Sequence, residues 1–202
     1  MKIKNIALVG NPNCGKTSLF NTLTGTRQKV ANYAGVTVER KEGSFNLPSG
    51  DAVRVLDLPG TYSLKPSSLD EEVTRAVCLG ELKGEVLPDI FICVVDATNL
   101  SLHLSLVLEV RALNRPMILV LNMMDEVKKR GISIDKDKLS QLLGIPVVEA
   151  VAVKTKGIQD LINQLDQKNL FITPYHSELD HFEQIKQITK QVILNNDSGD
   201  KR

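Results

Sequence analysis

The chain has 202 residues, of which 42% are hydrophobic, enough for the core of one α/β domain of about 165 residues plus a short appendage. Its formal net charge is +1, from 25 basic and 24 acidic residues, which excludes the strongly basic surface typical of proteins that bind nucleic acids or anionic membranes. Aromatic residues make up 4% and tryptophan is absent, so a base-stacking platform for single strands is not expected either.

Strand-like and helix-like segments alternate along most of the sequence. Strands are expected at residues 6–9, 39–47, 52–56, 89–95, 117–121 and 146–150, where apolar residues run continuously or alternate. Helices are expected at residues 17–23, 69–82, 101–113, 135–143 and 158–165, where apolar residues recur at helical spacing. Residues 27–38 show no sustained period and are expected to form a long loop, which in a compact domain is usually functional.

The alternation predicts an α/β fold with a mostly parallel sheet and helices on both faces. Such sheets bind ligands in the loops at the carboxyl ends of their strands. The main domain is expected at residues 1–168, followed by a short helical segment at 169–202. In that segment Phe182, Ile185, Ile188 and Val192 have helical spacing. The longest apolar runs are far shorter than the about 20 residues needed to span a bilayer, so we expect a soluble chain.

Residues 10–17 read Gly-Asn-Pro-Asn-Cys-Gly-Lys-Thr and fit the phosphate-binding pattern G-x-x-x-x-G-K-[ST] between a strand and a helix. Backbone N–H groups of such a loop, together with the helix N-terminus, favour phosphate. Lys16 is expected to reach the β- and γ-phosphates, and the Thr17 hydroxyl to ligate magnesium. The residues expected at the phosphates are Gly10, Asn11, Asn13, Cys14, Gly15, Lys16, Thr17 and Ser18. Cys14 is open to two interpretations, a redox-sensitive thiolate or a small residue tolerated in the loop.

Residues 57–60 read Asp-Leu-Pro-Gly and match D-x-x-G at 41 positions after Lys16 (57 − 16). Asp57 is expected to hold magnesium through water, and the N–H of Gly60 to meet the γ-phosphate. Thr37, in the long loop, would ligate magnesium only when a γ-phosphate is present, which makes a nucleotide-dependent switch. The two predicted switch loops contain Asn32, Tyr33, Gly35, Val36 and Thr37, and Asp57, Leu58, Pro59, Gly60 and Thr61.

Residues 122–125 read Asn-Met-Met-Asp and fit N-x-x-D, a pattern for guanine recognition. The Asp125 carboxylate can accept hydrogen bonds from guanine N1–H and the 2-amino group, which adenine lacks, so GTP is favoured over ATP. Ala152 can offer its backbone N–H to guanine O6. Met123 stands where most GTPases have a lysine, and Val151 where a serine is usual, so weak binding and fast nucleotide exchange are expected.

Taken together, these residues resemble the cytoplasmic N-terminal G domain of the bacterial ferrous iron transporter B (FeoB) family. The resemblance rests on residues 10–21, 34–41, 57–64, 121–125 and 142–147 and spans about residues 3–165. It implies a Ras-like P-loop GTPase with Mg²⁺, in which Lys16, Asn13, Thr37 and Gly60 serve hydrolysis and Asn13 ligates an activating K⁺. Residues 169–202 would then be a truncated or reduced form of the helical domain that stabilises bound GDP.

The same resemblance implies a membrane transport region in the full-length protein, a location at the cytoplasmic face of the bacterial inner membrane, and a possible homo-oligomer. Two alternatives stay open. A ribosome- or RNA-associated GTPase shares the phosphate loop, but such proteins usually add a basic module. A nucleotide-binding switch without turnover is the other, because Thr61 stands where many GTPases place a water-orienting glutamine, so unaided hydrolysis is expected to be slow.

Overall fold

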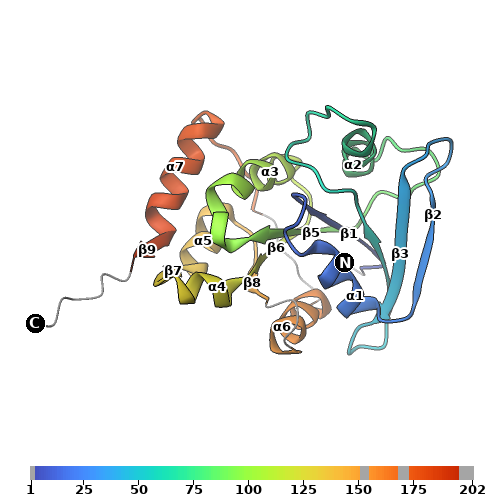
Figure 1. The fold of residues 1–202 in the computed structure, drawn as a ribbon, viewed down its shortest axis with the longest axis horizontal. Helices are drawn as coiled ribbons and strands as arrows, with labels where there is room; N and C mark the ends of the chain where they lie inside the picture. The colour runs from blue at the N-terminus through green and yellow to red at the C-terminus, as the bar shows by residue number, and fades with distance from the viewer. Residues whose placement is uncertain (1–2, 151–154, 168–172, 196–202) are drawn as a thin grey trace, which may run out of the picture.

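The computed structural model describes residues 3–150, 155–167 and 173–195 (Figure 1). In these ranges one sheet has the strand order β2-β3-β4-β1-β5-β6-β8. The strands are β1 Asn5–Gly10, β2 Gln28–Asn32, β3 Glu39–Asn46, β4 Ala52–Asp57, β5 Ile90–Asp96, β6 Met117–Asn122 and β8 Val147–Glu149. The β2–β3 and β3–β4 pairs are antiparallel and the other pairs are parallel. The predicted α/β architecture is confirmed.

Helices cover both faces of this sheet, as Figure 1 shows. They are α1 Lys16–Thr24, α2 Leu69–Leu79, α3 Leu100–Ala112, α4 Met124–Lys129, α5 Lys136–Leu143, α6 Thr155–Asp166 and α7 His181–Val192, with a 3₁₀ turn η1 at Ala97–Asn99. Buried apolar residues of the described chain gather in two clusters, one for each face. One cluster includes residues of α2, α3, α5 and α7, and the other includes residues of α1 and α6. The central strands are buried on both faces, which explains their continuous apolar runs.

Four local expectations differ from the structure. Residues 27–38 are not loop throughout, because β2 pairs with β3 along the sheet edge. The side chains of β2 are largely exposed, so this strand leaves no hydrophobic pattern in the sequence. Helix α2 ends at Leu79, earlier than expected, because Gly80 caps it in the left-handed conformation. Helix α4 and strand β7 Ile132–Ile134 were not predicted; both are too short for a periodic signal.

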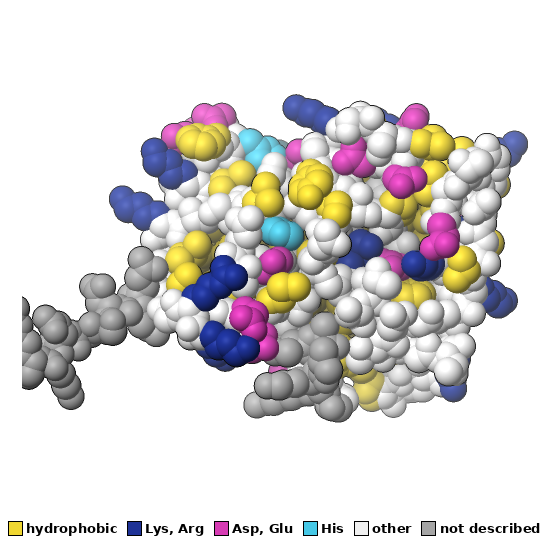
Figure 2. All heavy atoms as spheres, in the orientation of Figure 1, with side chains coloured by type: hydrophobic (Ala, Val, Ile, Leu, Met, Phe, Trp, Pro, Cys, Tyr) yellow, Lys and Arg dark blue, Asp and Glu magenta, His cyan; other side chains and the backbone are white. Residues whose placement is uncertain are grey.

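The C-terminal helix packs onto the main domain rather than standing apart from it. Ile188 and Val192 of α7 are buried in the cluster that also holds residues of α3 and α5. Strand β9 Ile193–Asn195 follows α7 directly and pairs antiparallel with β7. On the face drawn in Figure 2, Lys and Arg side chains lie among Asp and Glu rather than in one basic patch. Among the described residues, no helix has the length and apolar character to cross a membrane.

Arg111 of α3 fixes the segment that leads into α7. Its side chain is fully buried, and its Nε donates to the carbonyl of Leu143 at 2.8 Å, at the C-terminal end of α5. Its Nη2 donates to the carbonyl of Thr173, and the guanidinium carbon lies 5.1 Å from the ring centroid of Tyr175. Helix C-termini and aromatic faces both favour a cation. Arg111 therefore connects three separate parts of the chain.

Candidate functional site

The three sequence motifs meet at one edge of the sheet. Strands β1, β4, β5 and β6 are parallel to one another, so the segments after β1, β4 and β6 emerge at the same side. Residues 10–17 follow β1, residues 57–60 follow β4, and residues 122–125 follow β6. The loops after β1 and β4 are joined by a hydrogen bond of 3.1 Å from the N–H of Thr61 to the carbonyl of Gly10. The arrangement expected from the motifs is therefore present.

Lys16, Thr17 and Asp57 form a compact cluster of charge and hydroxyl. The Nζ of Lys16 lies 2.8 Å from Oδ1 of Asp57, and both side chains are more than nine-tenths buried. The Thr17 Oγ1 donates to Oδ2 of the same carboxylate at 3.1 Å. A hydroxyl and a carboxylate are the hard oxygen donors that Mg²⁺ prefers. The residues therefore fit a magnesium ion held by Thr17 and Asp57 beside the Lys16 ammonium.

The backbone of the loop is shaped for close approach. Asn13 and Gly15 have φ values of 62° and 94°, in the left-handed region. A Cβ at Gly15 would lie 1.9 Å from Nδ2 of Asn122, so glycine is required there by space as well as by conformation. Asn122 donates from the same Nδ2 to the carbonyl of Cys14 at 2.9 Å. The motif after β6 is thus bonded directly to the loop after β1.

Two cavities adjoin this loop. One of about 260 Å³ is lined by Lys16, Thr17, Asp57 and Gly60, with Val38 and Glu39 on its other wall. The second, of about 520 Å³, is lined by residues of the loop from Asn11 to Ser18 and by Met123. Lys16, Thr17 and Gly60 line both cavities, so the two form one continuous region. This region has the concave, cation-bearing walls that a polyphosphate requires.

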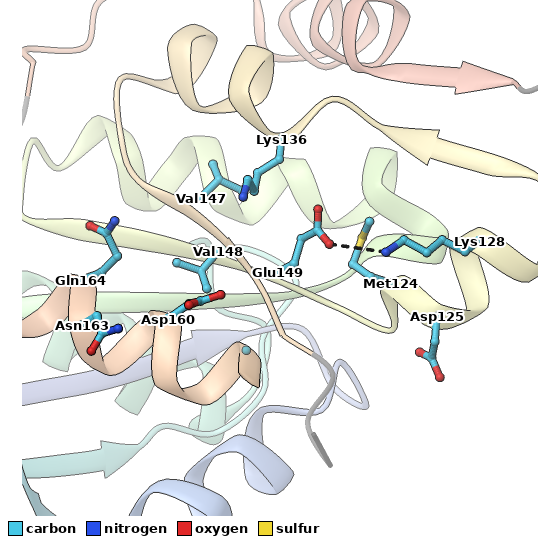
Figure 3. A pocket seen from close by; sticks show the side chains of 11 residues that line it. Met124, Asp125, Lys128, Lys136, Val147, Val148, Glu149, Asp160, Asn163 and Gln164 are labelled. Carbon is cyan, nitrogen blue, oxygen red and sulfur yellow. Dashed lines mark ion pairs between the residues drawn. The ribbon is translucent and has the colours of Figure 1, made fainter. Parts of the chain in front are cut away.

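Asp125 lies beyond Met123, in the first turn of α4. It lines a third cavity of about 660 Å³ that also includes residues of α5, β8 and α6 (Figure 3). In Figure 3 the Asp125 carboxylate points away from the Lys128–Glu149 ion pair, whose Nζ–Oε2 distance is 3.8 Å. The Asp125 carboxylate therefore projects apart from that pair. Val151 and Ala152, expected beside the base, lie outside the described residues.

The residues of the first predicted switch loop are not all gathered at this cluster. Tyr33 and Val38 are buried, Val36 is half-buried, and Asn32, Gly35 and Thr37 are exposed. Val38 and Glu39 line the cavity around Lys16 and Asp57, whereas Thr37 does not. The Thr37 hydroxyl can approach a metal at Asp57 only after the loop has rearranged.

Thr61 and Cys14 have chemistry fixed by their surroundings. Thr61 is fully buried, and its Oγ1 donates to the carbonyl of Ser63 at 2.6 Å, so this hydroxyl is engaged within its own loop. Burial raises the pKa of the Cys14 thiol above its usual value, although the backbone N–H and charge of Lys16 oppose that rise. The raised pKa argues against a reactive thiolate and supports the interpretation of Cys14 as a small packed residue.

The comparisons with known proteins agree with this geometry. The family model for ferrous iron transport protein B matches residues 4–165. The Fe(2+) transporter FeoB of Salmonella typhimurium is 48% identical over 173 residues, which are 84% of this chain and 22% of that protein. The Escherichia coli K12 protein is 47% identical over 83% of this chain and 21% of its own length.

The chain belongs to the ferrous iron transport protein B family.

It spans about a fifth of the length of the curated FeoB relatives it matches. Solved FeoB structures have the same fold. The cytosolic domain of L. pneumophila FeoB aligns with a TM-score of 0.85 at 32% identity, over 95% of this chain and 100% of that one. The cytosolic domain of T. maritima FeoB in its GMPPNP form aligns with a TM-score of 0.76 at 45% identity, over 85% and 67%.

Two residues that anchor the second switch loop were missed by the sequence analysis of this FeoB-family chain. Glu71 of α2 accepts hydrogen bonds from the N–H and Oγ of Ser67, at 2.8 and 2.7 Å, and from Oγ1 of Thr61 at 3.2 Å. Glu109 of α3 accepts from Oγ of Ser63 at 2.9 Å and from the N–H of Leu64. Glu71 is visible in the sequence only as part of an acidic first turn, and Glu109 only as a polar position on α3. No local pattern could show which loop they hold.

Proposed function

We propose that this chain binds GTP with Mg²⁺ and hydrolyses it to GDP and phosphate, as the regulatory G domain of a ferrous iron transporter. The observation that carries the proposal is the Lys16–Asp57–Thr17 cluster, in a cavity that the phosphate loop and Gly60 also line. The nucleotides printed for relatives, GMPPNP for T. maritima FeoB and GDP for the S. thermophilus G domain, support the choice of ligand.

In this proposal the chain acts by positioning and by charge. Backbone N–H groups of residues 10–18 surround the phosphates, and Lys16 balances charge on their outer oxygens. The N–H of Gly60 meets the γ-phosphate, and Thr37 joins the site when the first switch loop moves. Bound Mg²⁺, held by Thr17 and Asp57, supplies positive charge to the β- and γ-phosphate oxygens. Thr61 orients no water, because its hydroxyl is bonded to Ser63, so unaided turnover is slow.

Asn13 is proposed as a ligand of an activating K⁺. It is exposed beside the cavity of about 520 Å³, and its left-handed backbone turns it toward solvent at the entrance of the loop. A monovalent cation there would add positive charge near the transferring phosphoryl group, where other GTPases use an arginine. Asp125 is proposed to select guanine by accepting from its N1–H and 2-amino groups.

Residues 169–202 are proposed to be a reduced helical domain that steadies the nucleotide-binding core. Two observations support this: Arg111 bonds the segment entering α7 to α5, and the L. pneumophila cytosolic domain matches 95% of this chain over its entire length. The remaining four-fifths of the family's length is proposed to hold the membrane region that carries Fe²⁺. This chain would then lie at the cytoplasmic face of the inner membrane.

The test is phosphate release from GTP and ATP in KCl and in NaCl at matched ionic strength, with MgCl₂. We expect release from GTP only, faster in KCl, and abolished in Lys16→Ala. Asn13→Ala should lose the potassium stimulation, while Asn46→Ala, an exposed asparagine of β3, should keep it. GTP binding without release in either salt would instead support a nucleotide switch without turnover. Equal use of ATP would exclude the role given to Asp125.

A further inference from the structure

Tyr33 is the residue of the first switch loop that is packed most deeply into the protein. Its side chain is 2% exposed and belongs to the apolar cluster that contains Leu56 and Leu58 from β4 and its end, and Val73 and Val77 from α2. By contrast, Ala34, Gly35 and Thr37 are exposed. Burying an aromatic side chain is strongly favourable, so Tyr33 holds a loop that is otherwise open to solvent.

The backbone closes the loop around this anchor. The N–H of Tyr33 donates to the carbonyl of Val38 at 3.0 Å, and the N–H of Val36 donates to the carbonyl of Tyr33 at 3.2 Å. Gly35, with φ of 79°, occupies the third position of this turn, where a positive φ is required. Because Thr37 lies within the same closed loop, it cannot turn toward Asp57 while Tyr33 stays in place.

The hydroxyl of Tyr33 makes this packing weaker than it would otherwise be. The Oη atom is buried, and it has no hydrogen-bond partner among the residues that the structure describes. Burial raises the pKa of this hydroxyl well above its usual range, and the charge of Glu85 adds to the rise. A buried hydroxyl without a partner carries a desolvation penalty on the order of 10-fold in an equilibrium constant. The packed arrangement thus opposes its own stability at one atom.

The strand that follows the loop is fixed independently. Arg40 of β3 and Arg54 of β4 both pair with Glu42 and with Glu85, whose side chain is 8% exposed. This four-charge group ties β3 to the segment after α2. The mobile part is therefore confined to the loop before β3, and the ring of Tyr33 is its main anchor.

We propose that Tyr33 is a positioning residue for the γ-phosphate site: its ring holds the first switch loop with Thr37 in solvent, and its unpartnered hydroxyl keeps that arrangement weak enough for GTP to displace it. This inference rests on the proposed GTP binding. A ligand shifts the loop only as far as its preference for one arrangement allows. GDP, without a γ-phosphate, binds with the loop packed, whereas GTP binds with the loop released and Thr37 at the metal.

Two variants act in opposite directions. Tyr33→Phe keeps the ring and removes the unpartnered hydroxyl, so the packed loop gains stability. We expect GMPPNP to bind about 10-fold more weakly, with GDP affinity unchanged. Tyr33→Ala removes the ring, so the packed loop loses stability and the ratio of GMPPNP to GDP affinity should rise. Tyr175→Phe removes a tyrosine hydroxyl beside α7 and should leave this ratio unchanged.

The measurement uses the whole chain, titrated by calorimetry with GDP and with GMPPNP in the presence of Mg²⁺. Because the chain has no tryptophan, a single tryptophan introduced by Ala34→Trp reports on the loop. Its emission should differ between the two nucleotides in the parent, and that difference should shrink in Tyr33→Ala. Equal affinity ratios in the parent, Tyr33→Phe and Tyr33→Ala, or the same direction of change in both variants, would overturn the proposal while leaving GTP binding intact. Failure of the parent to bind either nucleotide would overturn the proposed function together with it.

Discussion

The Nδ2 atom of Asn122 donates a hydrogen bond of 2.9 Å to the carbonyl oxygen of Cys14, 108 residues away in the sequence. This bond connects the segment after β6 to the phosphate loop, and both groups are buried. The shape of the loop at Cys14 and Gly15 therefore depends on a side chain from the neighbouring motif.

Replacing Asn122 by alanine should weaken binding of GDP and GMPPNP alike. The carbonyl of Cys14 would be left buried without this partner, and the loop would lose its support beside Gly15. A buried unsatisfied group costs about 1–3 kcal/mol, so both dissociation constants should rise by roughly 5- to 150-fold. Calorimetric titration measures them, with Asn46→Ala as the control. A selective loss for GMPPNP alone would contradict this explanation, because the bond supports the loop beneath phosphates that both nucleotides share.

The motif residues could be placed from the sequence because each follows a strand with a strong apolar signal. Lys16, Asp57 and Asn122 come at the ends of buried runs, and parallel strands bring such ends together. The same logic fails for β2, whose exposed side chains carry no period and whose pairing is made by the backbone. It also fails for Glu71 and Glu109, because helical spacing shows that a position is polar but not which loop it holds.

Tyr33 and Arg111 show the other limit of sequence reasoning. An aromatic in a polar loop gives no sign that it will be 2% exposed, and an arginine on an amphipathic helix is ordinarily expected in solvent. Arg111 is fully buried because carbonyls of Leu143 and Thr173 and the ring of Tyr175 surround it. These partners come from separate segments, so only the packed structure brings them together.

Arg111→Met should destabilise the folded chain. The substitution approximately keeps the side-chain length but leaves the carbonyls of Leu143 and Thr173 without their donor. Burial already lowers the pKa of Arg111, although the charge of the Tyr175 hydroxyl opposes this shift, so part of the loss is offset by removing a desolvated cation. We expect a loss of about 2–3 kcal/mol and a fall in melting temperature of roughly 5–10 °C. Arg130→Met, at an exposed position, should melt within about 2 °C of the parent; equal melting of both variants would show that Arg111 adds no net stability.

Asp125→Asn should change base preference. The asparagine amide retains one acceptor but loses the charge, so GTP affinity should fall by about 100-fold. Xanthine carries a carbonyl in place of the 2-amino group, and the new amide N–H can donate to it, so XTP should bind the variant better than it binds the parent. Competition titrations with GTP, XTP and ATP measure this preference. The exposed Asp137→Asn change in α5 is the matched control, and unchanged GTP affinity in Asp125→Asn would remove Asp125 from the base site.

His103 of α3 predicts how stability depends on pH. It is 5% exposed, and its Nδ1 has no hydrogen-bond partner within the described ranges. Burial lowers its pKa, although the charge of Asp96 opposes the shift. Between the ordinary value of about 6.5 and the lowered one, the unfolded chain binds more protons than the folded chain. This contribution to stability is therefore complete above the ordinary pKa and is lost as the pH falls through that window.

Urea unfolding at pH 7.5 and at pH 5.5 tests the sign. The parent should have the lower midpoint at pH 5.5. In His103→Leu the titrating group is gone, so the difference between the two midpoints should shrink. His176→Gln changes an exposed histidine and should keep the parent's difference. Because carboxylates elsewhere contribute equally to all three proteins, an undiminished difference in His103→Leu would mean that the buried imidazole does not govern stability in this pH range.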